Sequence, residues 1–305
     1  MPAALTARTW IDLLSLACIW GGSFLAIRVA LDSIGPFQIV AARVSLGALT
    51  LWLILLALRL PRPSPRRWWA YLGMGLLNNV IPFGLIAWGQ QFVETGLAAI
   101  VNASTAVWGV LVAALLLADE RLTARRAAGV ALGFVGVATA IGPSALTSFD
   151  PRSLGQLAIV GATVSYAFAG VWGRTMLRGE PSLAASAGML TGSSLVAIPL
   201  ALAVEGAPPA SLPASGWAAV AYISVAATGI AYLFYWRILS SAGSGNAMLA
   251  TLLVAPVAIV LGALVRGEAL HGSAYAGFAL LALGLAVLEG RLLRRKPLAK
   301  DIPPG

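Results

Sequence analysis

The chain has 305 residues, of which 59% are hydrophobic and only 10% are charged, whereas an average soluble domain carries about 25% charge. This composition, with a mean hydropathy of +0.89, excludes an ordinary soluble protein. In a soluble protein, a formal charge of +9 would suggest binding to nucleic acid. In a membrane protein, the positions of the charges relative to the membrane explain the excess.

Apolar stretches bounded by charged residues, proline or glycine predict ten membrane spans of about 20 residues each. The first five cover 10–30, 36–58, 68–89, 95–117 and 125–142, and the second five cover 154–176, 183–204, 215–239, 245–266 and 272–292. A polar connector from Gly142 to Arg152 separates the two sets. No small-residue cleavage site follows the first span, so we expect an uncleaved first helix. The predicted fold is an all-α membrane protein of ten transmembrane helices.

The Lys and Arg residues are distributed unevenly between the predicted connectors. If the N-terminus is cytoplasmic, sixteen of the 20 lie in cytoplasmic segments and three, Arg28, Arg152 and Arg266, lie outside. The positive-inside rule therefore predicts that both termini are cytoplasmic. The basic run from Arg291 to Lys300 is then typical of a segment beside anionic lipid headgroups, and no nucleic-acid partner is expected.

The two halves repeat each other at a nearly constant offset. Glu120 and Glu268 are 148 positions apart. The same offset relates Trp88 to Trp236, Gly129 to Gly277 and Gly136 to Gly284, and near the start of each half an offset of 146 relates Trp20 to Tyr166. Because five spans are an odd number, the second repeat must enter the membrane with opposite topology. Inverted repeats are typical of secondary transporters, whose binding site lies near the midplane between the halves.

These motifs resemble the drug/metabolite transporter superfamily of EamA type. The resemblance rests on Arg43 and on the sequences WGGSFLAIR at 20–28, YAFAGVWGR at 166–174, LLLADERLTARRAAGVALGFVG at 115–136 and ALVRGEALHGSAYAGFALLALG at 263–284. It implies one five-helix repeat at 9–142 and a second at 152–293. It also implies export of metabolites, and the chain looks most like the YddG-type exporters of aromatic and other amino acids.

Polar and aromatic residues at mid-span depth are the candidates for a substrate site, because each must find a partner or line a watery space. The predicted substrate-binding residues are Trp20, Ser23, Asn79, Asn102, Thr105, Tyr166, Tyr232 and Tyr235. Aromatic residues from the two halves would face each other across the midplane, and Asn side chains would bind a ligand's amino and carboxylate groups. For each Asn or Thr, a helix–helix hydrogen bond is an equally good interpretation.

Arg43 is the one formal charge well inside a predicted span. It could attract a substrate carboxylate, but pairing with Asp32 or Glu94 is the interpretation that the sequence favours. No carboxylate lies at the centre of a span, so a proton relay lacks its usual residue, and Glu94 is the remaining candidate. The single cysteine, Cys18, and the single histidine, His271, provide neither a disulfide nor a metal site, and no cofactor is expected.

The sequence therefore favours a facilitative secondary transporter that exports amino acids or similar small metabolites by alternating access. The alternatives are a proton-coupled drug or metabolite efflux protein and an intramembrane enzyme acting on lipid-linked substrates. An enzyme is disfavoured, because the chain contains no clustered acids and no nucleophile–base pair. The expected partners are a small-molecule substrate and membrane lipid, the expected location is a bacterial inner membrane, and a monomer fits the sequence.

Overall fold

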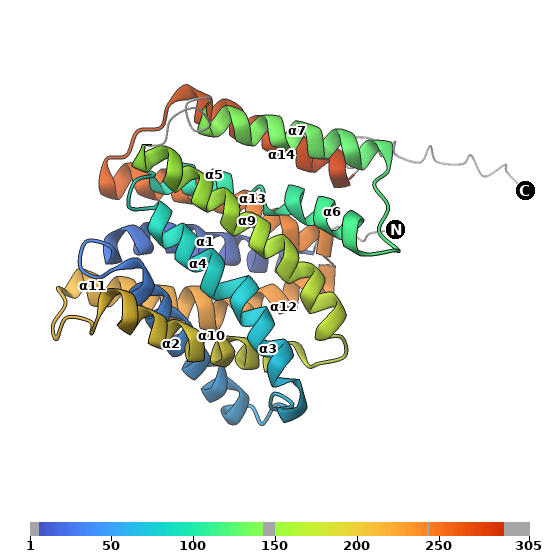
Figure 1. Ribbon diagram of the computed structural model, residues 1–305. Coiled ribbons are helices and arrows are strands. Elements are labelled where there is room, and N and C mark those ends of the chain that lie inside the picture. Colours follow the sequence, from blue (N-terminus) through green and yellow to red (C-terminus); the bar gives the residue numbers. More distant parts are fainter. Residues whose placement is uncertain (1–5, 143–149, 243, 290–305) are drawn as a thin grey trace, which may run out of the picture.

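The computed structural model describes residues 6–142, 150–242 and 244–289, and the described chain is a bundle of helices (Figure 1). The first half contains α1 (Ala7–Ala30), α2 (Pro36–Ala57), η1 (Pro65–Arg67), α3 (Trp68–Gly75), η2 (Leu76–Val80), α4 (Ile81–Gly89), α5 (Thr95–Asn102), α6 (Thr105–Leu116) and α7 (Ala124–Ile141). The second half contains α9 (Pro151–Met176), α10 (Ser182–Glu205), α11 (Ala214–Ala221), η3 (Tyr222–Ile230), α12 (Ala231–Ala242), α13 (Ser244–Arg266) and α14 (Gly272–Glu289).

These elements confirm the ten predicted spans. Eight continuous helical stretches are long and apolar enough to cross a membrane, and two shorter apolar helices lie at Ala250–Arg266 and Gly272–Leu288. Three spans are composite. The third runs from η1 through α3 and η2 to α4, the fourth joins α5 to α6, and the eighth joins α11, η3 and α12.

Helices α7 and α14 pack antiparallel, side by side at one edge of the bundle (Figure 1). A Cβ atom on Gly129 would lie 2.8 Å from the carbonyl oxygen of Gly284, and one on Gly136 would lie 2.8 Å from that of Gly277. Only glycine permits so close an approach of two backbones. The offset of 148 relates Gly129 to Gly277 and Gly136 to Gly284. Gly129 therefore contacts the repeat equivalent of Gly136, and Gly136 contacts the repeat equivalent of Gly129. Such reciprocal contacts are those of a two-fold axis, and they identify the inverted repeat in three dimensions.

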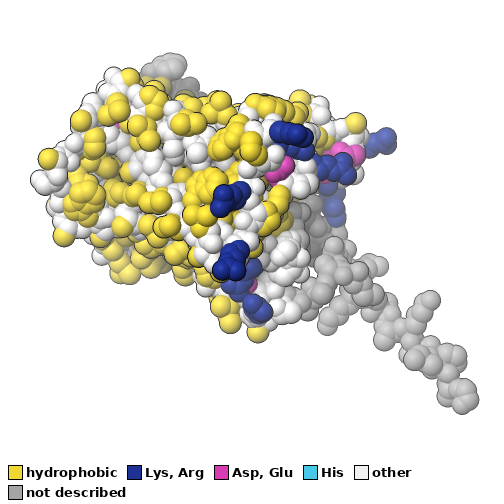
Figure 2. Space-filling model, turned by 90° about the horizontal axis from the view of Figure 1, so that it is seen from below, with side chains coloured by type: hydrophobic (Ala, Val, Ile, Leu, Met, Phe, Trp, Pro, Cys, Tyr) yellow, Lys and Arg dark blue, Asp and Glu magenta, His cyan; other side chains and the backbone are white. Residues whose placement is uncertain are grey.

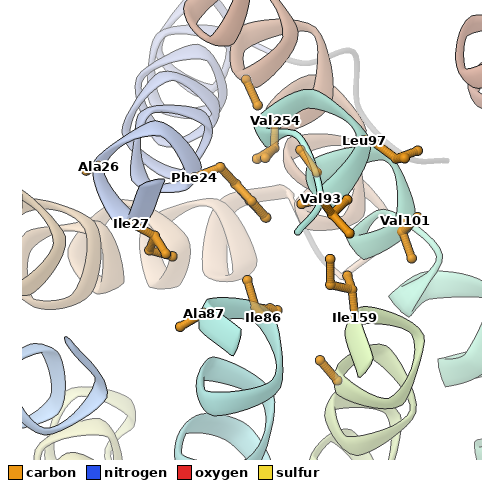
Figure 3. Close-up of a cluster of buried hydrophobic side chains, with 14 of the residues drawn as sticks. Phe24, Ala26, Ile27, Ile86, Ala87, Val93, Leu97, Val101, Ile159 and Val254 are labelled. Atoms are coloured by element: carbon orange, nitrogen blue, oxygen red, sulfur yellow. The ribbon is translucent and has the colours of Figure 1, made fainter. Parts of the chain in front are cut away.

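A hydrophobic cluster joins the two halves between the ends of several helices. Phe24 of α1, Ile86 of α4 and Leu97 of α5 pack there with Ile159 of α9 and Val254 of α13, and each of these side chains is at most 6% exposed (Figure 3). Dispersion contacts among densely packed side chains hold these helices together. The two repeats therefore share a common core.

Both repeats contain a π-helical segment at the same place. The segment η2 covers Leu76–Val80, and the offset of 148 maps it onto 224–228, inside η3 (Tyr222–Ile230). A π-helical turn widens the backbone spiral, and such turns occur frequently at functional sites. The sequence analysis predicted neither segment.

The two faces of the bundle differ in charge. We call the face where α1 begins the N-terminal face, and the other the opposite face. In the view of Figure 2, the Lys and Arg side chains gather at the right-hand end, which is the N-terminal face of Figure 1. Ion pairs between the halves occur on both faces, such as Arg174 with Glu120 at 3.0 Å on the N-terminal face and Arg266 with Asp32 at 2.7 Å on the opposite face.

Candidate functional site

Arg43 of α2 is buried between the two halves, with 8% of its surface exposed. Its Nε donates a hydrogen bond to the Oγ1 atom of Thr228 in η3 at 2.9 Å. Its guanidinium carbon lies 3.6 Å from the ring centroid of Phe83 in α4, in cation–π geometry. The charge is therefore held in place by one neutral hydroxyl and one aromatic face.

Small residues bring α2 and η3 close enough for the bond between Arg43 and Thr228. A Cβ atom on Gly47 would lie 2.7 Å from the Cγ2 atom of Thr228, and one on Gly229 would lie 2.5 Å from the Cγ2 atom of Thr50. The Thr228 hydroxyl donates to the carbonyl oxygen of Ile223, five residues earlier, at 2.9 Å. Since the hydroxyl proton is used there, its oxygen is free to accept from Arg43.

The expected pairing of Arg43 with Asp32 or Glu94 is wrong. Asp32 forms two bonds with Arg266, at 2.7 and 3.2 Å, and Glu94 forms two with Arg152, at 2.8 and 3.0 Å. Both acids lie on the opposite face, beyond the reach of a side chain that is fixed near the centre. Within the described residues, no ion pair connects Arg43 to a carboxylate.

Two of the predicted tyrosines lie beside Arg43. Tyr166 of α9 and Tyr232 of α12 both pack against the hydrophobic cluster that contains Phe83, the ring on which the Arg43 guanidinium lies. Tyr166 packs against the buried residues of both main hydrophobic clusters. The Tyr232 hydroxyl accepts a hydrogen bond from Nδ2 of Asn78 at 3.4 Å. Arg43, Tyr166, Tyr232 and Asn78 come from both repeats, and we call them the central cluster.

The π-helical turn η2 decides which of two adjacent asparagines joins the central cluster. Asn78 reaches it, whereas the predicted Asn79 is 0% exposed and donates to Oγ of Ser193 in α10 at 2.9 Å. The structure thus places Asn79 in a helix–helix contact. The sequence analysis missed Asn78, although its position beside a proline-containing segment at mid-span was a usable signal.

Trp20 and Tyr235 form an aromatic pair next to the central cluster. Their ring centroids are 5.9 Å apart, and Tyr235 lies three residues after Tyr232 on α12. The indole Nε1 of Trp20 donates to the carbonyl oxygen of Ala227 in η3 at 3.2 Å. Trp20 thus pairs with Tyr235 and not with Tyr166, its repeat equivalent. The predicted Ser23 is 4% exposed, and its hydroxyl donates to the Trp20 carbonyl oxygen at 2.6 Å.

Asn102 and Thr105 do not share one continuous helix face. The helix stops at Asn102 and restarts at Thr105, and between them the Ser104 N–H donates to the carbonyl oxygen of Val101, three residues earlier, at 3.0 Å. The Thr105 hydroxyl donates to the Asn102 carbonyl oxygen at 2.7 Å. Oδ1 of Asn102 is buried and has no hydrogen-bond partner among the described residues. The structure therefore places these two predicted residues at a break in the fourth span, apart from the contacts of the central cluster.

The opposite face carries a depression of about 480 Å³ that contains none of the predicted site residues. Asp32, Gln38 and Glu205 are among the residues that line it. The Glu205 carboxylate accepts the backbone N–H groups of Phe37 at 3.1 Å and Gln38 at 2.8 Å, at the start of α2. Since Asp32 and Glu205 are both engaged by the protein, this depression is a weaker candidate than the central cluster.

Comparison with known proteins agrees with this architecture. The sequence matches the EamA-like transporter family twice, over residues 9–142 and 153–289. It is 21% identical over 256 residues to the uncharacterized transporter YoaV of Bacillus subtilis, covering 84% of this chain and 87% of that protein. It is 25% identical over 293 residues to a probable terminal-alkyne amino-acid exporter of Streptantibioticus cattleyicolor, covering 96% of each chain.

A solved crystal structure shares the fold, with a TM-score of 0.66 and 22% sequence identity, and the alignment covers 95% of this chain and 99% of that one. The two family matches occupy most of the chain and fall on its two repeats. The protein belongs to the EamA-like transporter family and is a multi-pass membrane transporter.

Proposed function

We propose that the protein exports amino acids and closely related small carboxylates, and that Arg43 binds the substrate carboxylate. The observation that carries this proposal is a buried guanidinium at the contact between the repeats with no carboxylate partner among the described residues. Charged residues within membrane spans are rare, and they commonly mark a substrate or ion pathway.

The energetics support a charged ligand group at Arg43. Placing an arginine at the centre of a membrane helix costs about 2.5–3.5 kcal/mol on translocon-based scales. The Thr228 hydroxyl and the Phe83 ring offset part of that cost but leave the charge unneutralised. A substrate carboxylate would neutralise it through charge-assisted hydrogen bonds, which are about twice as strong as neutral ones.

The surroundings of Arg43 suit the rest of an amino acid. Tyr166, Tyr232 and the Trp20–Tyr235 pair offer flat rings that bury an apolar side chain, and ring faces also attract an ammonium group. An unpaired cation disfavours organic cations as substrates, which weakens the alternative of a general drug exporter. The relative from Streptantibioticus cattleyicolor, named a probable terminal-alkyne amino-acid exporter, supports the same substrate class.

We further propose that the two repeats rock against each other to give alternating access, with both termini in the cytoplasm of a bacterial inner-membrane protein that works as a monomer. Carboxylates with described contacts, such as Asp12 with Arg237 at 2.9 Å and Glu180 with Arg67 at 3.4 Å, lie near the span ends. A central proton site is therefore lacking among them, and transport is facilitative. Collapsing the proton gradient in proteoliposomes should leave downhill exchange intact, and its complete loss would contradict this part of the proposal.

The test of the substrate site uses purified protein in liposomes that contain labelled phenylalanine or leucine. The corresponding amino-acid amides, which lack the carboxylate charge, serve as controls. Losing a hydrogen bond to a charged group costs about 1.5–3 kcal/mol, so Arg43→Gln should weaken apparent affinity for the acids by about 10- to 150-fold. Arg152→Gln, which removes a partly exposed arginine on the opposite face, is the matched control. Equal losses in both variants, or equal transport of acids and amides by the unmodified protein, would overturn the assignment.

A further inference from the structure

We propose that the central cluster also binds a small monovalent inorganic anion of the chloride class, in competition with the substrate carboxylate. This inference rests on the proposed function only in placing that carboxylate at Arg43. It concerns the transporter when no substrate is bound, because another negatively charged group must then neutralise the guanidinium.

The central cluster offers hydrogen-bond donors that no described residue uses. Arg43 bonds to Thr228 through Nε alone, so both terminal amino groups remain free to donate to a ligand. The Tyr232 oxygen accepts from Asn78, which leaves its own proton available. The Tyr166 ring packs against the same hydrophobic cluster as Tyr232, and its hydroxyl forms no hydrogen bond with the described residues. A positive charge beside two free hydroxyl protons is a site for an anion.

Each carboxylate whose side-chain contacts the structure describes is already engaged by other residues. Asp32 and Glu94 are held in two-bond ion pairs on the opposite face. Glu268 accepts both the N–H and the hydroxyl of Thr95, each at 2.8 Å, and Asp12 pairs with Arg237 on the N-terminal face. The neutralising charge must therefore come from solution.

The chemistry of the site favours a monovalent anion. Arg43 supplies one positive charge, whereas Arg152 and Arg266 are engaged in ion pairs with Glu94 and Asp32 on the opposite face. A divalent sulfate or phosphate would leave one negative charge unpaired at low dielectric, which is strongly unfavourable. A compact halide also needs less space than a carboxylate attached to a side chain.

The first experiment measures thermal unfolding of the purified full-length protein in detergent with sodium chloride and with sodium isethionate, a larger monovalent anion that has no carboxylate, at equal ionic strength. Chloride should raise the Tm with the logarithmic concentration dependence of a ligand that binds only the folded state, and isethionate should not. Arg152→Gln should keep the chloride effect and Arg43→Gln should lose it. A chloride effect that persists undiminished in Arg43→Gln would overturn the inference.

A second variant keeps the test informative if Arg43→Gln fails to fold. Tyr232→Phe removes one donor and keeps the ring, and a neutral hydrogen bond contributes about 0.5–1.5 kcal/mol, so the chloride Kd should rise about 2- to 13-fold. Trp68→Phe, at an exposed position near the N-terminal face, is the control and should leave the Kd unchanged. An unchanged Kd in Tyr232→Phe would contradict the assigned donor set.

Competition separates this inference from the proposed function. If the proposed function and the anion site are both correct, the apparent Kd of a labelled amino acid rises linearly with chloride concentration. If amino acids bind through Arg43 but chloride neither stabilises nor competes, the inference is wrong and the proposed function stands. If chloride stabilises through Arg43 but no amino acid binds, the proposed function is wrong and the anion site stands.

Discussion

Replacing Glu268 with Gln tests the contact that attaches the second repeat to the fourth span. The Glu268 carboxylate accepts the backbone N–H of Thr95, the first residue of α5, at 2.8 Å and the Thr95 hydroxyl at 2.8 Å. Gln keeps the shape, but it replaces one acceptor oxygen with an NH₂ group and removes the negative charge from a helix N-terminus. Leaving a buried donor without its partner costs about 1–3 kcal/mol, and the lost charge–dipole interaction adds about 0.3–1 kcal/mol.

The assay is thermal unfolding in detergent, with Glu94→Gln as the control. This variant removes the same charge from the same face and from the N-cap of the same helix, so the two variants differ in the hydrogen bonds to Thr95. Glu94 binds Arg152, whose side chain is 44% exposed, and such surface pairs contribute about 0–1 kcal/mol. We therefore expect a clearly larger fall in Tm for Glu268→Gln. Gly262→Ala should act in the same direction, because its Cβ would lie 2.5 Å from a Glu268 carboxylate oxygen. Equal losses in the Glu268 and Glu94 variants would refute this reasoning.

Three further predictions concern packing, pH and topology. Gly136→Ala should lower the Tm by forcing α7 away from α14, whereas Gly109→Ala should leave it unchanged or raise it, because a Cβ there meets no atom within 4 Å. The hydrogen bond from Arg126 lowers the pKa of Glu120 below its ordinary value of 4.5. The ionised Glu120 therefore stabilises the folded protein above pH 4.5, and this stabilisation disappears on acidification through the lowered pKa. The Tm difference between the unmodified protein and Glu120→Gln should shrink over the same pH range. Cysteines introduced at 120 and 268, without the native cysteine, should react with an impermeant thiol reagent in intact cells only at 268, and labelling at 120 would reject the proposed orientation.

The sequence could predict the spans and the repeat because both depend on long-range patterns. Twenty consecutive apolar residues require a helix in a membrane, whatever surrounds them. The glycines that recur at the offset of 148 needed no structural information to be found, and Gly129 and Gly136 lie at the contact between the repeats. Repetition of small residues at a fixed offset was therefore a sound indicator of close backbone approach.

Local departures from the α-helix could not be predicted in the same way. The fourth span is interrupted between Asn102 and Thr105, and the turn η2 changes which way successive side chains point. A spacing of three residues would place Asn102 and Thr105 on one face only in an uninterrupted α-helix with a 3.6-residue period. A period derived from hydropathy carries no information about single hydrogen bonds.

The partner of Arg43 was mispredicted for a related reason. The sequence placed Asp32 and Glu94 on the same side of the membrane as Arg43, but depth alone does not decide which charges meet. Both acids lie closer to the surface, where Arg152 forms an ion pair with Glu94 and Arg266 forms one with Asp32, and where the side chains are partly exposed to water. Under the proposed function, the substrate carboxylate neutralises this buried arginine while it is bound, since a permanent carboxylate would compete with any ligand for the same guanidinium. The missing partner is therefore better evidence for a binding site than any of the aromatic residues around it.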